Sequence, residues 1–300
     1  MATDVSTTRP SPVRTWVMAS RPPTLPAAVV PVLVGSAVAY AEGAFRPLPF
    51  FAALLAAVLI QIGTNFANDY FDFRKGADTA ARLGPTRVTQ SGLIAPETVL
   101  RATVLTFGLA ALLGLYLVWV GGWPILLIGV LSIAAGVLYT GGPFPLGYNG
   151  LGDLFVFVFF GLVAVCGTVY VHLGTVPAAA WAAALPVAML ATAIIVVNNL
   201  RDADTDRVAG KRTLAVLLGK GFARGEYAAL VVGAYLVPPL SVVLGLASLW
   251  ALLPLLTLPL AAPQVRAMLT RDGAVLNLAL KGTGRLHMLF GALLALGLAL

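Results

Sequence analysis

Apolar stretches alternate with short polar segments along almost the whole chain. Each apolar stretch is close to the about 20 residues that a helix needs to cross a lipid bilayer, which is typical of a polytopic membrane protein. Nine spans are predicted, at about 24–41, 48–67, 101–119, 123–140, 151–171, 178–199, 226–246, 248–263 and 284–300. Since no soluble domain is left over, residues 1–300 are expected to form a single all-α integral membrane domain, with a polar cytoplasmic segment over residues 1–20.

The composition supports this interpretation. Hydrophobic residues make up 59% of the chain, charged residues make up 10%, and the mean hydropathy is +0.93. A soluble domain of this length would carry far more surface charge. The first span also resembles a signal peptide with Ala39-Tyr40-Ala41 as its cleavage site. A retained membrane helix is favoured, because Pro26 and Pro31 interrupt the apolar run and the remaining chain is membrane-embedded.

The formal net charge of +7 is explained by where the basic residues fall. If the N-terminus is cytoplasmic and the chain crosses nine times, every Lys and Arg except Arg46 lies on the inner side. This asymmetry follows the positive-inside rule, and shifting the count by one span would remove it. We therefore expect a multi-pass protein of the plasma (inner) membrane. The basic charge is a matter of topology, so no nucleic-acid partner is expected.

Two polar clusters follow apolar helices in the same manner. The first is NFANDYFDFRKGADT at 65–79, and the second is VVNNLRDADTDRVAGKRT at 196–213. Each places Asn at the cytoplasmic end of a helix, then Asp at helical spacing, then basic residues and Gly. Four predicted helices separate the clusters, so both lie on the inner side of the membrane. This is the pattern of an internal repeat of a polar helix end.

Residues three or four positions apart share one helix face, and two pairs of carboxylates have this spacing: Asp69 with Asp72, and Asp202 with Asp206. Asp204 falls on another face of its helix and ranks lower. Asp78 follows Gly76, where the chain can turn back toward the first pair. The carboxylates of each cluster are therefore expected to act together.

Ionisable groups at membrane depth are costly and usually mark function. The alternative is that both clusters are ordinary solvated loops in which Asp and Arg neutralise each other. Two matched clusters, each attached to a spanning helix, favour a functional site instead. Carboxylates gathered in one pocket repel one another. Mg²⁺ relieves that repulsion, because it prefers oxygen ligands and is commonly shared between carboxylates and phosphates. The basic residues beside the clusters suit such phosphates, and they are Lys75, Arg87, Lys211 and Arg212.

A diphosphate fits this arrangement, because it accepts metal on one side and Arg or Lys on the other. A polyprenyl diphosphate brings such a head group to a membrane, with its hydrocarbon tail in the bilayer. A cation-coupled transporter is the alternative from another class. It is disfavoured because the acids lie at one membrane face, where basic residues accompany them. His172 and His287 are too separated in sequence to suggest a His-based metal site.

These motifs resemble those of the UbiA-type intramembrane aromatic prenyltransferases. NDYFDFRKGAD is close to that family's NDxxD followed by a further Asp, and NNLRDADTD supplies its DxxxD. More specifically, the chain resembles the 1,4-dihydroxy-2-naphthoate polyprenyltransferase branch, which serves menaquinone biosynthesis. The supporting stretches are ASRPPTLPAAVVPVLVG at 19–35, GPTRVTQSGLIAP at 84–96, LYTGGPFPLGYNGLGDLFVFVFFG at 138–161 and GKRTLAVLLG at 210–219.

The resemblance implies a fold, a cofactor and an activity. The fold is a bundle of about nine helices around a central cavity, with the Asp motifs at its cytoplasmic end. Two Mg²⁺ ions are implied to bridge the donor diphosphate, with Asn198 or Asn199 nearby and with metal ligands from both motifs: Asn68, Asp69, Asp72, Asp78, Asp202 and Asp206. The gap between Asp72 and Asp78 is longer than in the 4-hydroxybenzoate enzymes, which favours the naphthoate branch and leaves the role of Asp78 open.

The implied reaction transfers a polyprenyl group from polyprenyl diphosphate to 1,4-dihydroxy-2-naphthoate. Diphosphate and CO₂ are lost, and the product is demethylmenaquinone or demethylmenaquinol. Another aromatic acceptor, such as 4-hydroxybenzoate or homogentisate, is the alternative within the family. An allylic cation formed on the way needs a dry pocket, and aromatic faces stabilise a cation. Tyr139, Tyr148, Tyr70 and Phe71 are candidates for that contact or are simple interface aromatics.

The acceptor and the leaving group need further partners. Arg21 either binds the acceptor carboxylate, as Arg87 also could, or only anchors the chain at the inner surface. Asp153 could bind acceptor hydroxyls or orient a base. The alternative is that it only caps the start of its helix, where the helix dipole favours an acidic side chain. The Gly-flanked loop GPTRVTQSG is expected to hold Arg87, Gln90 and Ser91 near the diphosphate or the acceptor.

Overall fold

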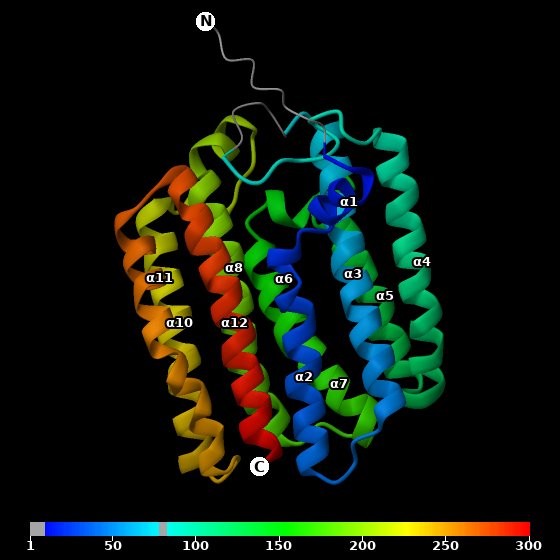
Figure 1. The fold of residues 1–300 in the computed structure, drawn as a ribbon, viewed down its shortest axis with the longest axis vertical. Helices are drawn as coiled ribbons and strands as arrows, with labels where there is room; N and C mark the ends of the chain where they lie inside the picture. The colour runs from blue at the N-terminus through cyan, green and yellow to red at the C-terminus, as the bar shows by residue number, and fades with distance from the viewer. Residues whose placement is uncertain (1–9, 78–82) are drawn as a thin grey trace, which may run out of the picture.

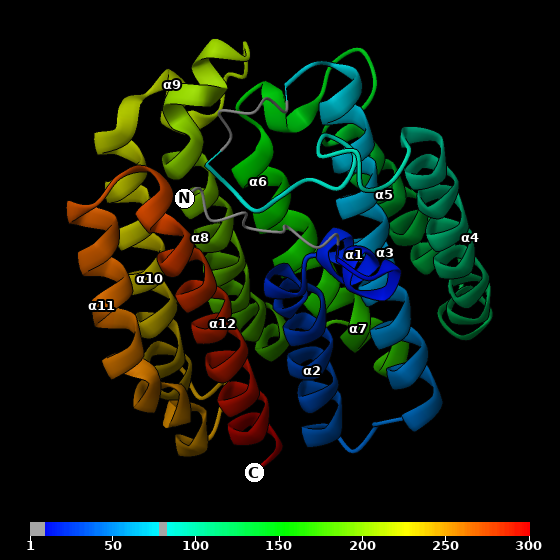
Figure 2. The ribbon, with the colours of Figure 1, turned by 45° about the horizontal axis from the view of Figure 1, so that its top comes forward.

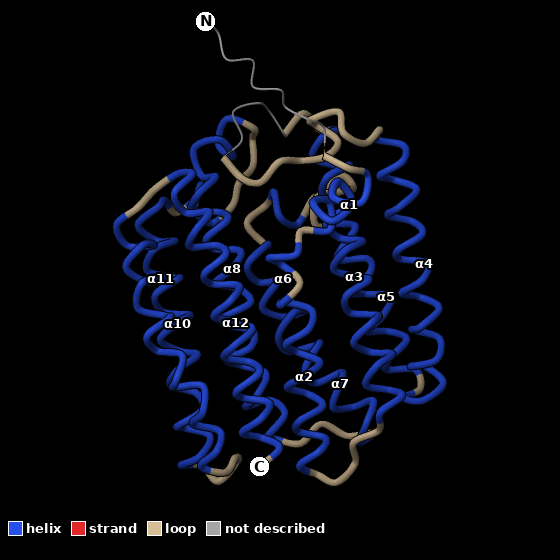
Figure 3. Tube along the Cα trace, viewed as in Figure 1, coloured by secondary structure: helices blue, strands red, loops and turns tan. Residues whose placement is uncertain are grey.

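A computed structural model describes residues 10–77 and 83–300. These residues form helices joined by short loops, and no strand occurs among them (Figure 3). The apolar runs fold as helices because a chain in lipid must satisfy its backbone hydrogen bonds internally. The all-α membrane fold expected from the hydrophobic pattern is confirmed.

The first half of the chain forms a bent helix pair, then two long helices and one shorter helix. The elements are α1 (Pro12–Ser20), η1 (Pro22–Thr24), α2 (Pro26–Ala41), α3 (Pro47–Arg74), α4 (Pro96–Gly121) and α5 (Trp123–Leu138). Helix α1 ends because Arg21 has a left-handed φ of 51° and the following prolines have no N–H for a helical hydrogen bond. The chain consequently bends by 54° before α2.

The second half contains three helices of 24 or more residues and several shorter or interrupted ones. The elements are η2 (Leu146–Tyr148), α6 (Gly152–Val156), η3 (Phe157–Val163), α7 (Ala164–Leu173), α8 (Ala178–Val208), α9 (Leu214–Leu217), α10 (Gly219–Val243), η4 (Leu249–Thr257), α11 (Leu258–Thr270), η5 (Gly273–Val275) and α12 (Leu276–Ala299). η3 is a π-helix that continues α6 into α7, so these three segments act as one span.

Seven helices in the described part of the chain are long and apolar enough to cross a membrane, and the bent pair α1 and α2 makes an eighth if counted as one span. Helix α5 is apolar but shorter. Every predicted span coincides with one of these helices or helix pairs. The prediction of nine crossings and of a cytoplasmic N-terminus stays a prediction, because length and composition alone do not fix which helices cross.

The long helices run side by side, and both polar clusters lie at one end of the bundle (Figures 1 and 2). This is the end at which α3 and α8 finish, and residues 83–95, which lead into α4, cross it (Figure 2). The C-terminus lies at the opposite end (Figure 1). Arg46, which is predicted to be the one basic residue outside, also lies there, immediately before the start of α3.

Helix α8 is the most enclosed of the candidate spans, with 72% of its most apolar stretch buried. Small side chains let its neighbours approach closely. At Gly161, in η3, a Cβ atom would overlap the backbone and side chain of Ala188 on α8. The π-helix is therefore pressed against the central helix, and this contact fixes the wall that faces the cavity described below.

Candidate active site at the charged end of the bundle

The ends of α3 and α8 meet around one ammonium group. Lys211 Nζ lies 3.6 Å from Asp72 Oδ1 and 3.7 Å from Asp206 Oδ1. Asp72 belongs to the first acidic motif and Asp206 to the second, and Lys211 follows α8 in the turn toward α9. The two motifs, more than a hundred residues apart in sequence, therefore share one cation at the same end of the bundle.

Asp72 is the most highly connected carboxylate of the site. It is 1% exposed, its Oδ2 forms a salt bridge of 2.7 Å with Arg87 Nη2, and its Oδ1 accepts a 2.7 Å hydrogen bond from the Tyr148 hydroxyl. Arg87 is itself 5% exposed. Charge-assisted hydrogen bonds of this kind are short and strong, so Asp72 holds two separate loops against α3.

Asp69 anchors the loop that carries Arg87. Its Oδ2 accepts from the Val88 backbone N–H at 3.1 Å, and its Oδ1 accepts from the Thr89 N–H at 3.0 Å. Val88 is fully buried in a small apolar cluster that includes Phe66. Because both oxygens of Asp69 hold backbone groups of this loop, the carboxylate positions Arg87 over the site.

Tyr148 lies between two lysines. The Lys75 and Lys211 ammonium nitrogens lie 5.1 and 4.7 Å from the centre of its ring, which are cation–π distances. Lys75 also donates to the Thr140 carbonyl at 2.7 Å. Partial burial lowers the pKa of Lys75, the charge of Asp72 opposes this, and the charge of Lys211 adds to it. The Arg212 backbone N–H donates to the Tyr148 carbonyl at 2.8 Å, while its side chain is exposed.

The remaining aspartates of the second motif have different surroundings. Asp202 accepts two hydrogen bonds from its neighbour Arg201, at 2.8 and 2.6 Å. Arg201 is buried and also donates to Asn277 on α12 at 2.9 Å. Asp204 forms a 2.7 Å salt bridge with Lys220 and has an exposed side chain, on another face from Asp202. The sequence analysis missed Arg201, because this residue lies just beyond the predicted span 178–199 and counts there only as one of the basic residues of the inner side.

The asparagines of the two motifs contact other elements. Asn68 accepts a 2.8 Å hydrogen bond from the Thr140 hydroxyl. Asn199 donates to both oxygens of Asp153, at 3.2 and 3.3 Å, while Asn198 beside it is half-buried. Asp153 is buried at the start of α6. The second motif therefore reaches across to α6, at the start of the cavity wall.

The other predicted residues lie at the edges of this region. Arg21 donates to the Asn65 carbonyl of α3 at 3.4 Å. Ser91 donates to the Arg87 carbonyl at 2.6 Å, and Gln90 beside it is half-buried. Asp78 lies outside the described residues.

Tyr139 joins the charged region to the apolar interior. A Cβ atom at Gly147 would lie 2.8 Å from its ring, and one at Gly152 would lie 2.8 Å from its hydroxyl, so these glycines allow close packing. Its phenolic hydroxyl can donate a hydrogen bond to a group in the cavity.

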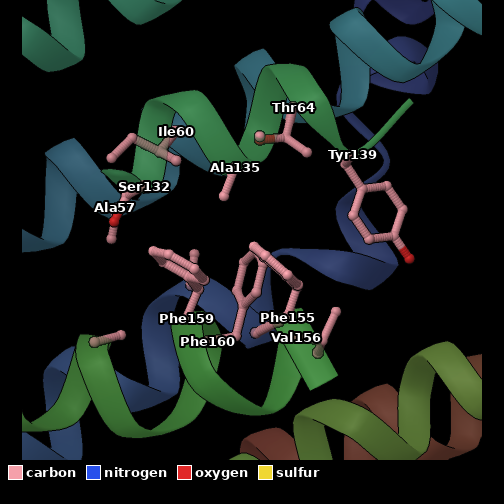
Figure 4. Close-up of a pocket in the computed structure, with 14 residues that line it drawn as sticks. Ala57, Ile60, Thr64, Ser132, Ala135, Tyr139, Phe155, Val156, Phe159 and Phe160 are labelled. Atoms are coloured by element: carbon pink, nitrogen blue, oxygen red, sulfur yellow. The ribbon is translucent and has the colours of Figure 1, made fainter. Parts of the chain in front are cut away.

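An apolar cavity of about 110 Å³ begins beside Tyr139 (Figure 4). Ile60 and Thr64 of α3 line one side, and aromatic rings of α6 and η3 line the other (Figure 4). The rings of Phe155 and Phe159 are stacked, with centroids 5.7 Å apart and planes 15° apart. Thr64 precedes Asn68 by one helical turn, about 6 Å along α3, so the cavity begins directly below the charged groups.

Comparison with known proteins agrees with this geometry. The family model described as "UbiA prenyltransferase family" matches residues 28–298. The chain belongs to the UbiA prenyltransferase family. The expected family resemblance is therefore confirmed over nearly the whole chain.

Two relatives in this family carry the name 1,4-dihydroxy-2-naphthoate octaprenyltransferase. The protein of Escherichia coli (strain K12) is 40% identical over 97% of this chain and 96% of its own length. The protein of Mycobacterium tuberculosis (strain H37Rv) is 41% identical over 94% of this chain and 95% of its own length.

Solved UbiA structures share the fold. A UbiA homolog from Aeropyrum pernix K1 has a TM-score of 0.70 at 16% identity and covers 90% of this chain and 96% of its own. A UbiA homolog from Archaeoglobus fulgidus, bound to GPP and Mg²⁺, has a TM-score of 0.65 at 16% identity, and covers 95% of this chain and 99% of its own.

The donor atoms at the charged end of this UbiA-family chain fit a divalent cation that prefers oxygen. No group of three or more His, Cys, Asp or Glu side chains within residues 10–77 and 83–300 is arranged to hold a metal ion. Asp69, Asp72 and Asp202 instead bind groups of the chain itself. Lys211, however, marks a position at which Asp72 and Asp206 together hold one positive charge. Carboxylate and amide oxygens around such a position are ligands that Mg²⁺ accepts.

Proposed function

We propose that this protein transfers a polyprenyl group from polyprenyl diphosphate to 1,4-dihydroxy-2-naphthoate, releasing diphosphate and CO₂ and forming demethylmenaquinol, from which demethylmenaquinone arises only by a separate oxidation. One observation carries the proposal: Lys211 joins carboxylates of both acidic motifs directly above an apolar, aromatic cavity. A polar head group and a hydrocarbon tail are thereby both accommodated. The relatives named for this activity support the choice of acceptor.

The donor diphosphate is assigned to the region around Tyr148. Lys75 and Arg87, from the connection between α3 and α4, and Lys211, which follows α8, approach this region and offer positive charge to the phosphate oxygens. Positive groups placed where negative charge develops lower the barrier to its formation. Tyr148 keeps the two lysines apart and, through Asp72, keeps Arg87 in place.

Two Mg²⁺ ions are assigned to the oxygens of the two motifs. Asp72 and Asp206 are the central ligands in this proposal, and the remaining predicted ligands are Asn68, Asp69, Asp202 and Asp78. When bound there, Mg²⁺ supplies further positive charge to the departing diphosphate. GPP and Mg²⁺ are bound together by the Archaeoglobus fulgidus homolog, which supports a shared site for donor and metal.

The allylic end of the donor is assigned to the cavity below. The bond between C1 and the diphosphate oxygen breaks, and its electron pair leaves with the diphosphate. The stacked Phe155 and Phe159 offer aromatic faces to the cationic carbon, and Tyr139 lines the same cavity. An apolar wall keeps water from capturing that carbon. A ring carbon of the acceptor then forms the new bond to C1, and the acceptor carboxylate leaves as CO₂.

The acceptor is assigned to the edge formed by α6 and the second motif. Asp153, held by Asn199, is buried where the cavity meets the charged region, and it can accept a hydrogen bond from an acceptor hydroxyl. Arg21, on the loop between α1 and α2, is assigned to the acceptor carboxylate. In this proposal the site opens toward the cytoplasm in the cell membrane, because the basic residues gather at this end.

A competition assay tests the proposed function. Purified protein receives one polyprenyl diphosphate, Mg²⁺ and equal amounts of 1,4-dihydroxy-2-naphthoate and 4-hydroxybenzoate, and products are identified by mass. The expected main product is the prenylated naphthalene that has lost its carboxylate. EDTA is expected to stop diphosphate release and excess Mg²⁺ to restore it. A mainly prenylated 4-hydroxybenzoate would assign the protein to another branch, and cation uptake by vesicles without diphosphate release would indicate a transporter.

Tyr148→Phe is expected to lower kcat/KM for the donor by about 10-fold or more. The substitution keeps the ring between the two lysines but removes the hydrogen bond to Asp72, and hydrogen bonds to charged groups are worth about 1.5–3 kcal/mol. Tyr148→Leu removes the ring as well, so its effect should be larger. Initial rates at varied donor concentration measure both. Unchanged rates in both variants would remove Tyr148 from the site.

A further inference from the structure

Residues 83–89, the segment that carries Arg87, are also held from the side of α12. Asn277, in the first turn of α12, donates a hydrogen bond from its side-chain amide to the Leu83 carbonyl at 2.8 Å. The Leu83 side chain lies beside η5, because a Cβ atom built at Gly273 would be 3.8 Å from its Cδ1. The segment is therefore anchored on α3 at one end and on α12 at the other.

The same side chain of Asn277 also contacts the second acidic motif. Its Oδ1 accepts a 2.9 Å hydrogen bond from Arg201 Nη1 on α8. The other side of that guanidinium group is bound by Asp202, and the Arg201 side chain is fully buried. Asn277 thus uses its oxygen on α8 and its N–H on the Leu83 carbonyl. An amide side chain can do both at once, because it carries an acceptor and donors.

These contacts close a ring at the charged end of the bundle. Each member binds the next through a salt bridge or a hydrogen bond, or continues the same segment of chain. In order, the members are the segment from Leu83 to Arg87, then Asp72, Lys211, Asp206, the turn of α8 back to Asp202 and Arg201, and finally Asn277. The ring joins α3, α8 and α12, so the position of Arg87 depends on all three helices.

We propose that Asn277 is a positioning residue for prenyl transfer, which fixes the Arg87 segment relative to the second motif and so sets where the Arg87 guanidinium group meets the donor diphosphate. This inference rests on the proposed function. Asp72 holds the end of the Arg87 side chain and Asp69 holds the backbone after it, whereas Asn277 holds the backbone before it. Positive charge stabilises developing negative charge only when it is correctly placed, and a misplacement of about 1 Å can cost about 100-fold in rate.

Two substitutions of Asn277 separate this role from simple attachment of α12 to α8. Asn277→Asp keeps the shape and the oxygen that accepts from Arg201, but it replaces the N–H donor by an oxygen that repels the Leu83 carbonyl. Asn277→Leu is similar in size and removes both hydrogen bonds. If Asn277 only attached α12 to α8, the aspartate variant would behave like the parent protein. If it holds Leu83, both variants lose the anchor.

Both variants are expected to lower kcat/KM for the prenyl donor by about 10-fold to 100-fold, while KM for the acceptor stays unchanged. Initial rates at varied donor and varied acceptor concentrations measure the two effects. Asn277→Asp should unfold at the same temperature as the parent, because the contact with Arg201 is kept. Arg224→Ala is the matched control. Arg224 binds the Leu269 carbonyl and Asp272 beside η5, on the exposed surface, so its loss should leave the donor kinetics unchanged.

A spin label reports the position of the segment without relying on activity. Thr86 is exposed and precedes Arg87, and Cys166 is the one native cysteine and is buried. A nitroxide is attached to Thr86→Cys in a Cys166→Ala background, and its electron paramagnetic resonance spectrum is recorded. Adding Asn277→Asp should make the label more mobile, whereas adding Arg224→Ala should leave the spectrum unchanged.

The outcomes separate this inference from the proposed function. Unchanged donor kinetics in both Asn277 variants, or an unchanged label spectrum in Asn277→Asp, would overturn the positioning role. A lower unfolding temperature in Asn277→Asp would make its lost activity a folding effect and would overturn that role as well. Absence of prenyl transfer in the unmodified protein would overturn the proposed function itself, whatever the spin label shows.

Discussion

Asp206→Asn is expected to reduce kcat/KM for the prenyl donor by about 100-fold to 1,000-fold, the range found when one electrostatic contact to developing charge is removed. Asp206 and Asp72 share the Lys211 ammonium group, and their carboxylates belong to the two motifs that we propose bind the donor head group. Replacing one carboxylate by an amide keeps the shape but removes the negative charge that a cation needs. Steady-state rates at saturating acceptor and varied Mg²⁺ measure the effect, and the requirement for Mg²⁺ should rise.

Asp204→Asn is the matched control for this experiment. Asp204 lies two residues before Asp206 in the same helix, but its exposed side chain pairs with Lys220 on α10, away from the site. A surface ion pair of this kind contributes about 0–1 kcal/mol to stability, so near-normal activity is expected. Equal losses of activity in the two variants would mean that both substitutions act by disturbing the fold at the end of α8. Near-normal activity in both variants would show that the second motif has no role in catalysis.

Gly161→Ala is expected to destabilise the protein by about 1–3 kcal/mol or more, because overpacking forces backbone and side chains to shift. The added Cβ would overlap Ala188 of α8, and both partners belong to helices that cannot give locally. Phe159 and Phe160 of the same π-helix line the first cavity, so activity should fall as well. Thermal unfolding in detergent, followed by tryptophan fluorescence, measures the change.

Gly167→Ala in α7 is the control for this substitution. Its added Cβ would meet only Ile128, at 3.4 Å, which is ordinary contact. Alanine is favoured over glycine within a helix by about 0.5–1 kcal/mol, so this variant should be as stable as the parent or slightly more so. If Gly161→Ala behaved in the same way, the close approach of η3 to α8 would not be important for stability.

The hydrophobic pattern predicted the helices well, because the length of an apolar run and its internal hydrogen bonding leave few alternatives in lipid. Helix spacing paired Asp202 with Asp206 and set Asp204 apart, and the structure places Asp204 on an exposed face. The pattern did not predict the π-helix at Phe157–Val163. An apolar run looks the same in α- and π-helical windings, and the difference follows from packing against α8.

The contacts inside the charged region could not be predicted from the sequence, for a different reason. The hydrogen bonds of Arg201 to Asn277, and of Asn199 to Asp153, depend on how far α12 and α6 lie from α8. Spacing within one helix carries no information on such distances. The apolar cavity beside Tyr139 is similar, since small residues from several helices line it and none of them is unusual by itself.

The two hydrogen bonds from the Val88 and Thr89 backbone to Asp69 bear on how inactive variants are interpreted. A mutational survey of the first motif would record a change in activity at Asp69 and at Asp72 alike. Asp69 binds the backbone of the segment that carries Arg87, whereas Asp72 binds the Arg87 side chain, so loss of Asp69 would move a guanidinium group even in an experiment where no metal takes part. Lost activity after substitution of Asp69 would therefore first indicate that the loop has moved. Whether Asp69 is a metal ligand has to be measured by spectroscopy or metal binding.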